Sequence, residues 1–297
     1  MTRKQQVFRK GRLLMAQWIG ERNKKLGISI LFKIKGKPII RPAIFFKSII
    51  ITATDALGKI LVFEEEEDYT TIQIAEKWDT YSEMLVHVAM CAHPNPSRVL
   101  IIGGGDGGTA REVLKHDTVK EVTIVEIDEK VIEACKDFLK IDNGALSSKR
   151  TRIVIKDGLE YLEDYNGEPY DIILGDWTDP YIDTPAEKLI TEKFFAAAHK
   201  ALAPNGILVT QSGSPIFQQE ITRRTFKTAK KFFKNVFLYT APVPFYPGGL
   251  WSFVIASNTI DPRTPIRSVR GTIYYNRNIH EAVFVLPTFL KEIYHEE

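Results

Sequence analysis

The stretch IIGGGDGGTARE, residues 101–112, decides how the rest of this chain is interpreted. Apolar residues lead into a run of glycines, and a helix-forming segment follows. This order is typical of a turn that joins a strand to a helix. Glycines such as Gly103 and Gly105 allow the backbone to approach a ligand closely and to adopt positive φ. The turn is therefore a candidate ligand-binding turn at the edge of a sheet.

An acidic residue, Asp106, lies in the middle of this turn. In dinucleotide-binding turns the free N–H groups of the helix attract a pyrophosphate. Asp106 places negative charge where that phosphate would lie, which excludes most ATP and NAD sites. The turn instead suits a nucleoside that carries positive charge near its sugar. Sulfonium nucleosides such as S-adenosylmethionine or its decarboxylated form meet this requirement.

The composition is that of a globular protein with a large core. The chain has 297 residues, of which 44% are hydrophobic and 26% are charged. This length predicts one large domain or two domains of unequal size. Cys91 and Cys135 are too few for a disulfide framework. Without a signal peptide or an apolar run of membrane-spanning length, we expect a cytoplasmic protein with no membrane partner.

Charge is unevenly distributed along the chain. The first 50 residues contain 13 Lys and Arg and a single acid, Glu21, whereas the remainder contains 27 basic and 36 acidic residues. A basic arm can bind nucleic acid, but no aromatic-basic interleaving or known binding module accompanies it. We therefore expect no nucleic-acid partner. The acidic remainder fits a polycationic substrate, because clefts of one sign concentrate ligands of the other.

Two regions differ in their hydrophobic pattern. Residues 1–78 combine a basic segment, with a possible helix over Leu13–Lys25, and a small β domain rich in β-branched residues. Residues 79–297 alternate apolar strands with amphipathic helices, which predicts a Rossmann-like α/β domain with a parallel sheet covered on both faces. The expected strands and helices of this second domain include Val99–Ile102, Thr109–Lys115, Val122–Ile127, Glu129–Leu139, Ile153–Ile155, Ile172–Leu174, Ala186–Ala201, Ile207–Thr210 and Gln218–Phe233.

Carboxylates follow the predicted strands of this sheet. Glu126 ends the second strand, where an acid accepts hydrogen bonds from ribose hydroxyls. Asp157 and Gly158 follow the third strand, and Asp176 and Asp179 follow the fourth. Each acid alone could be a helix N-cap or a solvated loop residue. Because parallel strands end at one edge of the sheet, we expect these acids to meet there.

Two reactions fit a site in which these acids meet. A methyltransferase binds a sulfonium nucleoside that has both an ammonium and a carboxylate, whereas an aminopropyltransferase binds the decarboxylated compound. Asp106 would repel the carboxylate of the first ligand and pair with the ammonium of the second. A third possibility is a non-catalytic sensor of nucleosides or polyamines. Asp176 and Asp179 favour an amine acceptor over a neutral one.

Several motifs together resemble the spermidine synthase family of polyamine aminopropyltransferases. The likeness runs in order from about residue 40 to 294. The motifs that carry it are residues 103–112, Val125–Asp128, Asp157-Gly158, Gly175–Pro180, Tyr81–His87, Pro244–Gly249 and Tyr274–Pro287.

The resemblance implies a role for each matching residue. Decarboxylated S-adenosylmethionine would be the co-substrate, with Asp106 on its ammonium, Glu126 on its ribose, and Asp157 with Gly158 at its adenine. The catalytic residues would be Asp176 and Tyr81. The residues that bind the amine would be Asp179, Gln211 and Tyr246. The family implies no prosthetic group and no metal, and a homodimer or homotetramer is expected.

The chain also departs from the family pattern. Ser82 follows the tyrosine where His or Gln is usual, Lys47 replaces a common glutamine, and Trp177-Thr178 replaces Ser-Ser. The loop from Tyr181 to Glu187 is about two residues longer than in putrescine-specific members. Gly175-Asp176 together with Val209–Gly213 also resembles the thermospermine synthase branch. Putrescine is the favoured acceptor, while thermospermine or spermine synthesis from spermidine, and agmatine as acceptor, remain open.

Overall fold

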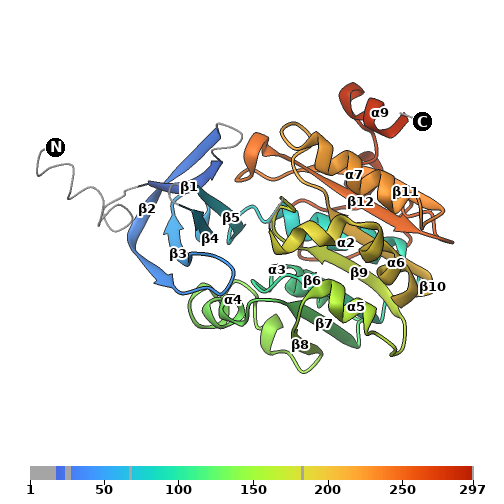
Figure 1. The fold of residues 1–297 in the computed structure, drawn as a ribbon, viewed down its shortest axis with the longest axis horizontal. Coiled ribbons are helices and arrows are strands. Elements are labelled where there is room, and N and C mark those ends of the chain that lie inside the picture. Colours follow the sequence, from blue (N-terminus) through green and yellow to red (C-terminus); the bar gives the residue numbers. More distant parts are fainter. Residues whose placement is uncertain (1–17, 24–27, 67–68, 182–183, 296–297) are drawn as a thin grey trace, which may run out of the picture.

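The computed structural model describes residues 18–23, 28–66, 69–181 and 184–295 of the chain. A closed antiparallel barrel precedes a larger domain built around a seven-stranded sheet, and the two lie side by side (Figure 1). The barrel closes because β1 pairs with both β2 and β5. Its strands are β1 Trp18–Asn23, β2 Ile28–Arg41, β3 Ser48–Thr54, β4 Gly58–Glu66 and β5 Tyr69–Ala75.

The larger sheet has the order β11-β12-β10-β9-β6-β7-β8. Strands β8, β7, β6, β9 and β10 are parallel, while β12 runs antiparallel to both β10 and β11. The strand order reverses between β6 and β9, and ligands of such sheets bind in the crevice at this point. The strands are β6 Arg98–Gly103, β7 Glu121–Glu126, β8 Thr151–Ile155, β9 Tyr170–Asp176, β10 Leu202–Gln211, β11 Asn235–Pro242 and β12 Leu250–Ser257.

Helices cover both faces of this sheet, so its central strands are buried on both sides. Every residue of α2 is buried, since this helix lies between the sheet and neighbouring elements. The helices are α2 Thr80–Ala92, α3 Gly108–Val113, α4 Glu129–Ala134, α5 Gly158–Glu163, α6 Glu192–Ala201, α7 Gln219–Ala229, α8 Arg277–Ala282 and α9 Thr288–His295. Shorter turns are the π-helix η1 Cys135–Leu139 and the 3₁₀ turns η2 Ala145–Ser147, η3 Pro185–Ile190 and η4 Pro247–Gly249.

The predicted fold class, a Rossmann-like sheet with a small N-terminal β domain, is confirmed. Two local expectations are wrong. The possible helix over Leu13–Lys25 contains strand β1, whose Trp18 to Asn23 pair with β2; the rest of that range lies outside the described residues. The helix expected over Ala186–Ala201 is split into η3 and α6, because Thr191 is extended and its side chain caps α6 by accepting from the Phe194 N–H.

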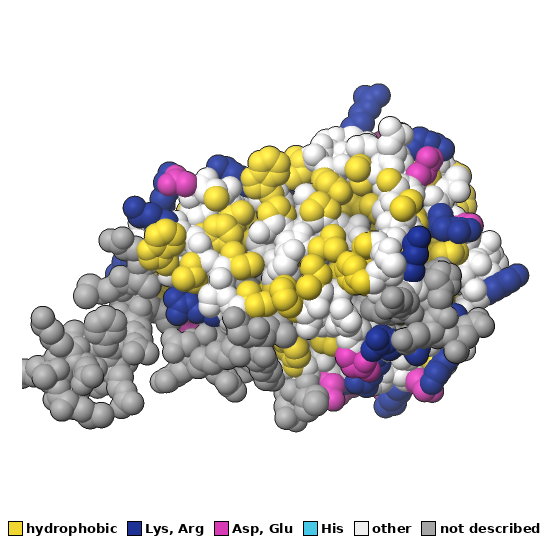
Figure 2. All heavy atoms as spheres, turned by 90° about the horizontal axis from the view of Figure 1, so that it is seen from above, with side chains coloured by type: hydrophobic (Ala, Val, Ile, Leu, Met, Phe, Trp, Pro, Cys, Tyr) yellow, Lys and Arg dark blue, Asp and Glu magenta, His cyan; other side chains and the backbone are white. Residues whose placement is uncertain are grey.

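The face of the molecule seen in Figure 2 has hydrophobic side chains spread over its middle and Lys and Arg side chains mostly toward its edges. Scattered apolar side chains of this kind are normal on protein surfaces. Within the described residues, none of the helices combines the length and the apolar character needed to cross a bilayer.

One buried carboxylate connects the barrel to the sheet. Asp128, two residues after β7, is fully buried and caps α4 by accepting a hydrogen bond from the Lys130 N–H. Its other oxygen accepts from the N–H groups of Ile44 and Phe45, in the segment between β2 and β3, at 2.7 and 3.2 Å. Asp128 therefore fixes the position of Phe45 relative to the crevice.

We expect Asp128→Ala to lower the free energy of unfolding by about 1–3 kcal/mol, because it leaves three backbone N–H groups without their acceptor. Denaturant titration measures this change. The exposed neighbour provides a control, since Glu129→Ala should change stability by no more than about 0.5 kcal/mol. Equal stability of the two variants would contradict the assigned role of Asp128.

Candidate active site

The glycine-rich turn lies between β6 and α3 and brings two strand ends unusually close. Gly103 has φ +84°, and a Cβ at this position would lie 2.0 Å from the carbonyl oxygen of Asp176. The Gly104 N–H donates to that same carbonyl oxygen at 2.9 Å. A Cβ at Gly105 would lie 2.8 Å from Oε2 of Glu126. Both glycines predicted to bind the ligand thus make room for carboxylate-bearing residues of neighbouring strands.

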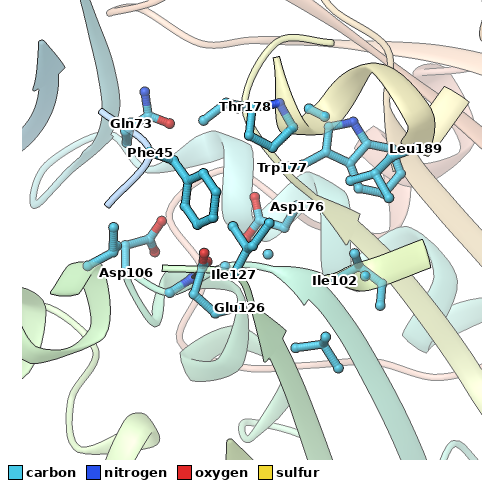
Figure 3. Close-up of a pocket in the computed structure, with 18 of the residues that line it drawn as sticks. Phe45, Gln73, Ile102, Asp106, Glu126, Ile127, Asp176, Trp177, Thr178 and Leu189 are labelled. Carbon is cyan, nitrogen blue, oxygen red and sulfur yellow. Dashed lines mark hydrogen bonds between the residues drawn. The ribbon is translucent and has the colours of Figure 1, made fainter. Parts of the chain in front are cut away.

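A single pocket at this edge brings together the four acids predicted for the donor and the reaction. Asp106, Glu126, Asp157 and Asp176 all line it, together with Gly103, Gly105 and Gly158. Figure 3 shows the carboxyl groups of Asp106, Glu126 and Asp176 in one region of the pocket, near the ring of Phe45. The acids at the strand ends therefore meet in space, as their places in the sequence predict.

Asp176 is held by two hydroxyl groups. Tyr81 Oη donates to one carboxylate oxygen at 2.9 Å, and Thr109 Oγ1 donates to the other at 2.5 Å. Tyr81 belongs to α2 and Thr109 to α3, so two helices fix the orientation of this carboxylate. Both contacts favour the ionised form of Asp176.

Enclosure within the protein raises the pKa of three acids in this pocket, Asp106, Glu126 and Asp176. It raises the pKa of Asp176 to about 6, and the nearby charge of Asp79 acts in the same direction. Enclosure also raises the pKa of Glu126 to about 7, against the hydrogen bonds that Glu126 accepts from the backbone N–H groups of Asp128 and Gly105. The pKa of Asp106 is raised well above its usual value by enclosure and by the charge of Asp176. A cationic ligand would relieve this unfavourable concentration of like charge.

Asp157 has structural contacts as well as a place in the pocket. One oxygen caps α5 by accepting from the N–H groups of Leu159 and Glu160. The other lies 2.6 Å from Nζ of Lys188 in η3. A Cβ at Gly158 would lie 2.3 Å from a methyl carbon of Ile102, so this glycine keeps the adjoining wall of the pocket thin. Asp157 is therefore a helix N-cap and also lines the pocket, so it can have both of the roles considered for it from the sequence.

A second pocket adjoins the first and contains the residues predicted to bind an amine. Asp179, Gln211 and Tyr246 line it. Five residues line both pockets and mark where they meet: Gln73, Tyr81, Trp177, Thr178 and Tyr246. Since Tyr81 holds Asp176, the predicted catalytic pair lies at this junction.

Aromatic rings form much of the second pocket. The rings of Tyr81 and Tyr246 are 5.6 Å apart, and Trp251 packs against Tyr246 at 4.6 Å. The Tyr246 hydroxyl donates to the carbonyl oxygen of Gln73 at 2.6 Å, which fixes its ring. Ring faces attract organic cations, so this wall suits an alkylammonium.

Gln211 uses its amide within the protein. Its nitrogen donates to the carbonyl oxygens of Trp177 and Thr178 at 3.2 and 3.4 Å, and its oxygen accepts from the Gly213 N–H at 2.8 Å. Gln211 thus supports the segment between Asp176 and Asp179 from behind. Asp183, which belongs to the longer loop noted in the sequence, lies outside the described residues.

The sequence analysis did not identify Phe45 and Gln73, which line the first pocket, or Thr109, which holds Asp176, as site residues. Phe45 and Gln73 come from the barrel and enter the pocket from that side (Figure 3). They lie among β-forming residues with no local pattern that marks them. Thr109 could have been found, because it follows the glycines directly and hydroxyl side chains often support a catalytic acid.

The described residues contain no group of three or more His, Cys, Asp or Glu side chains placed to hold a metal ion. His87 and His116 instead form a buried chain with Glu112, with His87 Nδ1 to His116 Nε2 at 3.0 Å and His87 Nε2 to Glu112 Oε2 at 2.9 Å.

Comparisons with known proteins agree with this architecture. The model of the spermine/spermidine synthase domain matches residues 78–265. A polyamine aminopropyltransferase of Clostridium kluyveri is 36% identical over 268 residues, which cover 89% of this chain and 94% of that protein. A polyamine aminopropyltransferase of Bacillus cereus is 40% identical over 252 residues, covering 84% and 89%.

Solved structures show the same likeness over nearly the whole chain. A spermidine synthase in complex with the transition-state analogue AdoDATO superposes with a TM-score of 0.82 at 32% identity, covering 97% of this chain and 98% of the other. Spermidine synthase from Thermotoga maritima gives a TM-score of 0.81 at 32% identity, covering 99% of each chain.

The fold and the site together define a transferase of the Rossmann-like class. The chain belongs to the spermine/spermidine synthase family, and its activity is that of a polyamine aminopropyltransferase.

We expect Asp106→Asn to stabilise the ligand-free protein at pH 8 by about 1 kcal/mol, or ~2 °C in Tm. Asn retains an oxygen that can accept from the Gly108 N–H, as Asp106 does at 2.7 Å, while the like charge beside Asp176 is removed. Because the pKa of Asp106 is raised in the folded state, its destabilising effect develops as the pH rises above the unfolded value of about 3.9.

The difference in Tm between Asp106→Asn and the wild-type protein should therefore shrink between pH 8 and pH 4. Thermal melting across this range measures it. A variant that is less stable than the wild type at pH 8 would contradict the charge argument.

Proposed function

We propose that this enzyme transfers the aminopropyl group of decarboxylated S-adenosylmethionine to putrescine and releases methylthioadenosine. The observation that carries the proposal is the junction of two pockets at Tyr81 and Asp176. One pocket contains Asp106, Glu126 and Asp157, and the other contains Asp179. Two cationic ligands can therefore meet end to end at the predicted catalytic pair.

The donor fits the first pocket through the chemistry of its three acids. In our proposal Asp106 binds the ammonium of the aminopropyl arm, Glu126 binds the ribose hydroxyls, and Asp157 with Gly158 binds the adenine. Among the described residues, no Lys or Arg forms an ion pair with Asp106, so its charge is available to a ligand cation. The carboxylate of intact S-adenosylmethionine would be repelled there, which argues against a methyltransferase.

The reaction needs an acceptor nitrogen with a free lone pair. An alkylamine has a pKa near 10.4, and removing its proton at pH 7 costs about 4.6 kcal/mol. We propose that Asp176 and Tyr81 orient the amine and take up its proton. The nitrogen then attacks the methylene carbon next to the sulfonium in line with the C–S bond. The bonding electrons return to sulfur, and methylthioadenosine leaves as a neutral thioether.

Charge matching favours a diamine as the acceptor. Among the described residues that line the second pocket, Asp179 is the only one with a carboxyl group. A diamine that presents one neutral nitrogen to Asp176 has one remaining ammonium, which Asp179 can bind. Alignment of the two reactants in adjoining pockets would supply much of the rate enhancement.

Product analysis tests this function directly. The purified protein is incubated with decarboxylated S-adenosylmethionine and equal concentrations of putrescine, agmatine, spermidine and norspermidine, and the products are separated by chromatography that resolves isomers. We expect the amount of spermidine to increase by as much as the methylthioadenosine formed. Preferential formation of spermine or thermospermine would replace putrescine with spermidine as acceptor. In a parallel incubation with S-adenosylmethionine in place of the decarboxylated compound, methylation of any amine would contradict the donor assignment.

We expect Asp176→Asn to reduce kcat by about 10²–10⁴-fold. The amide keeps the size of the carboxylate but cannot accept a proton from the amine. The dissociation constant of methylthioadenosine, measured by calorimetry, should change by less than about threefold, because that ligand ends before the reacting amine. Unchanged turnover would remove Asp176 from the catalytic role.

The expected homodimer or homotetramer stays a prediction, which light scattering of the full chain would check.

A further inference from the structure

Asp179, at the acceptor pocket, is held by neutral groups. The amide nitrogen of Gln218 donates to Asp179 Oδ2 at 2.6 Å, and the Tyr181 hydroxyl lies 2.5 Å from that same nitrogen. Across the described part of the chain, no Lys, Arg or His forms an ion pair with Asp179. The immediate surroundings of this carboxylate therefore leave its negative charge uncompensated.

The orientation of Gln218 is fixed by the surrounding backbone. Its side-chain oxygen accepts a hydrogen bond from the Ser214 N–H at 2.6 Å, and the residue is only 7% exposed. Because a backbone N–H can only donate, the amide oxygen must face Ser214 and the amide nitrogen must face Asp179.

Gly213 supplies the space that this arrangement needs. It has φ +79°, and a Cβ there would lie 2.6 Å from Oε1 of Gln218. The Gly213 N–H donates to Gln211, whose amide supports Trp177 and Thr178. The turn from Gly213 to Gln218 is thus built to place one neutral donor against Asp179.

We propose that Gln218 is a positioning residue that determines acceptor specificity, by holding Asp179 with a neutral amide so that the acceptor pocket offers one carboxylate to one ammonium. The inference rests on the proposed function and deepens it. A diamine brings one ammonium to Asp179 after its other nitrogen has been deprotonated. A triamine brings two, and the second would find no carboxylate partner at Gln218.

A change of charge at this position tests the inference. Gln218→Glu keeps an oxygen acceptor for the Ser214 N–H but replaces the neutral donor with a second carboxylate next to Asp179. We expect the ratio of kcat/KM for spermidine to kcat/KM for putrescine to rise about tenfold, equivalent to about 1.4 kcal/mol. The change should occur in the KM of the amines, with the KM of decarboxylated S-adenosylmethionine unchanged.

The neighbouring residue provides a matched control. Gln219 is exposed at the start of α7, so Gln219→Glu adds the same charge one position away, on the surface. The acceptor ratio of this control should stay within about twofold of the wild-type ratio. An equal ratio in Gln218→Glu and Gln219→Glu overturns the inference.

A second variant covers the case in which Gln218→Glu does not fold, as judged by lost binding of methylthioadenosine. Gln218→Met has similar length but neither donor nor acceptor, and we expect it to raise the KM of putrescine about fivefold or more without changing the KM of the donor. An unchanged putrescine KM overturns the inference. A wild-type protein that transfers no aminopropyl group to any amine contradicts the proposed function instead.

Discussion

The structure depends on the enclosure of several carboxylates at one edge of a sheet. Asp106, Glu126 and Asp176 share a pocket, and burial raises the pKa of each. Such an arrangement is unfavourable in the empty protein, since like charges and loss of water both oppose ionisation. Arg111 lies nearby, but its guanidinium is engaged by Asp79 at 2.6 Å and Glu112 at 2.8 Å. This arginine is therefore not free to neutralise these acids, which supports the proposal that the pocket binds a cationic ligand.

The backbone makes this enclosure possible. Gly103 on β6 pairs with Asp176 on β9 at the point where the strand order reverses, and no side chain separates them. The carboxylates thus come from adjacent strands and converge without any loop having to fold over them. The barrel contributes the opposite wall through Phe45 and Gln73, and Asp128 fixes that wall to the end of β7. Hydrogen bonds therefore join the larger domain, which carries the acids, to the barrel, which covers them, next to the site.

The sequence predicted the parts of the structure that follow local rules. Apolar strands alternating with amphipathic helices indicated the parallel sheet, and acids at strand ends indicated the crevice. The helix predicted around Trp18 failed because β1 pairs with β2 and, far along the chain, with β5 through Arg22 and Thr70, and this pairing overrides local preference. Phe45 and Gln73 could not be assigned for the same reason, since only closure of the barrel against the sheet brings them to the pocket. The family resemblance proposed a role for Gln211 in the amine site, but it could not show that this amide is engaged by the backbone of Trp177 and Thr178.

The two pockets differ in how their acids are supported, and this difference has a chemical consequence. In the first pocket, Glu126 and Asp106 accept hydrogen bonds from backbone N–H groups of the glycine-rich turn, so their positions follow the sheet itself. In the second, Asp179 is held by the side chain of Gln218, which lies in a turn after β10. Backbone contacts persist through most substitutions, whereas a side-chain contact is lost with a single change. On the proposed assignment of the two pockets, donor binding is therefore tied to the fold. Acceptor choice can then change by substitution in one turn without disturbing the sheet, the glycine-rich turn or the Tyr81–Asp176 pair.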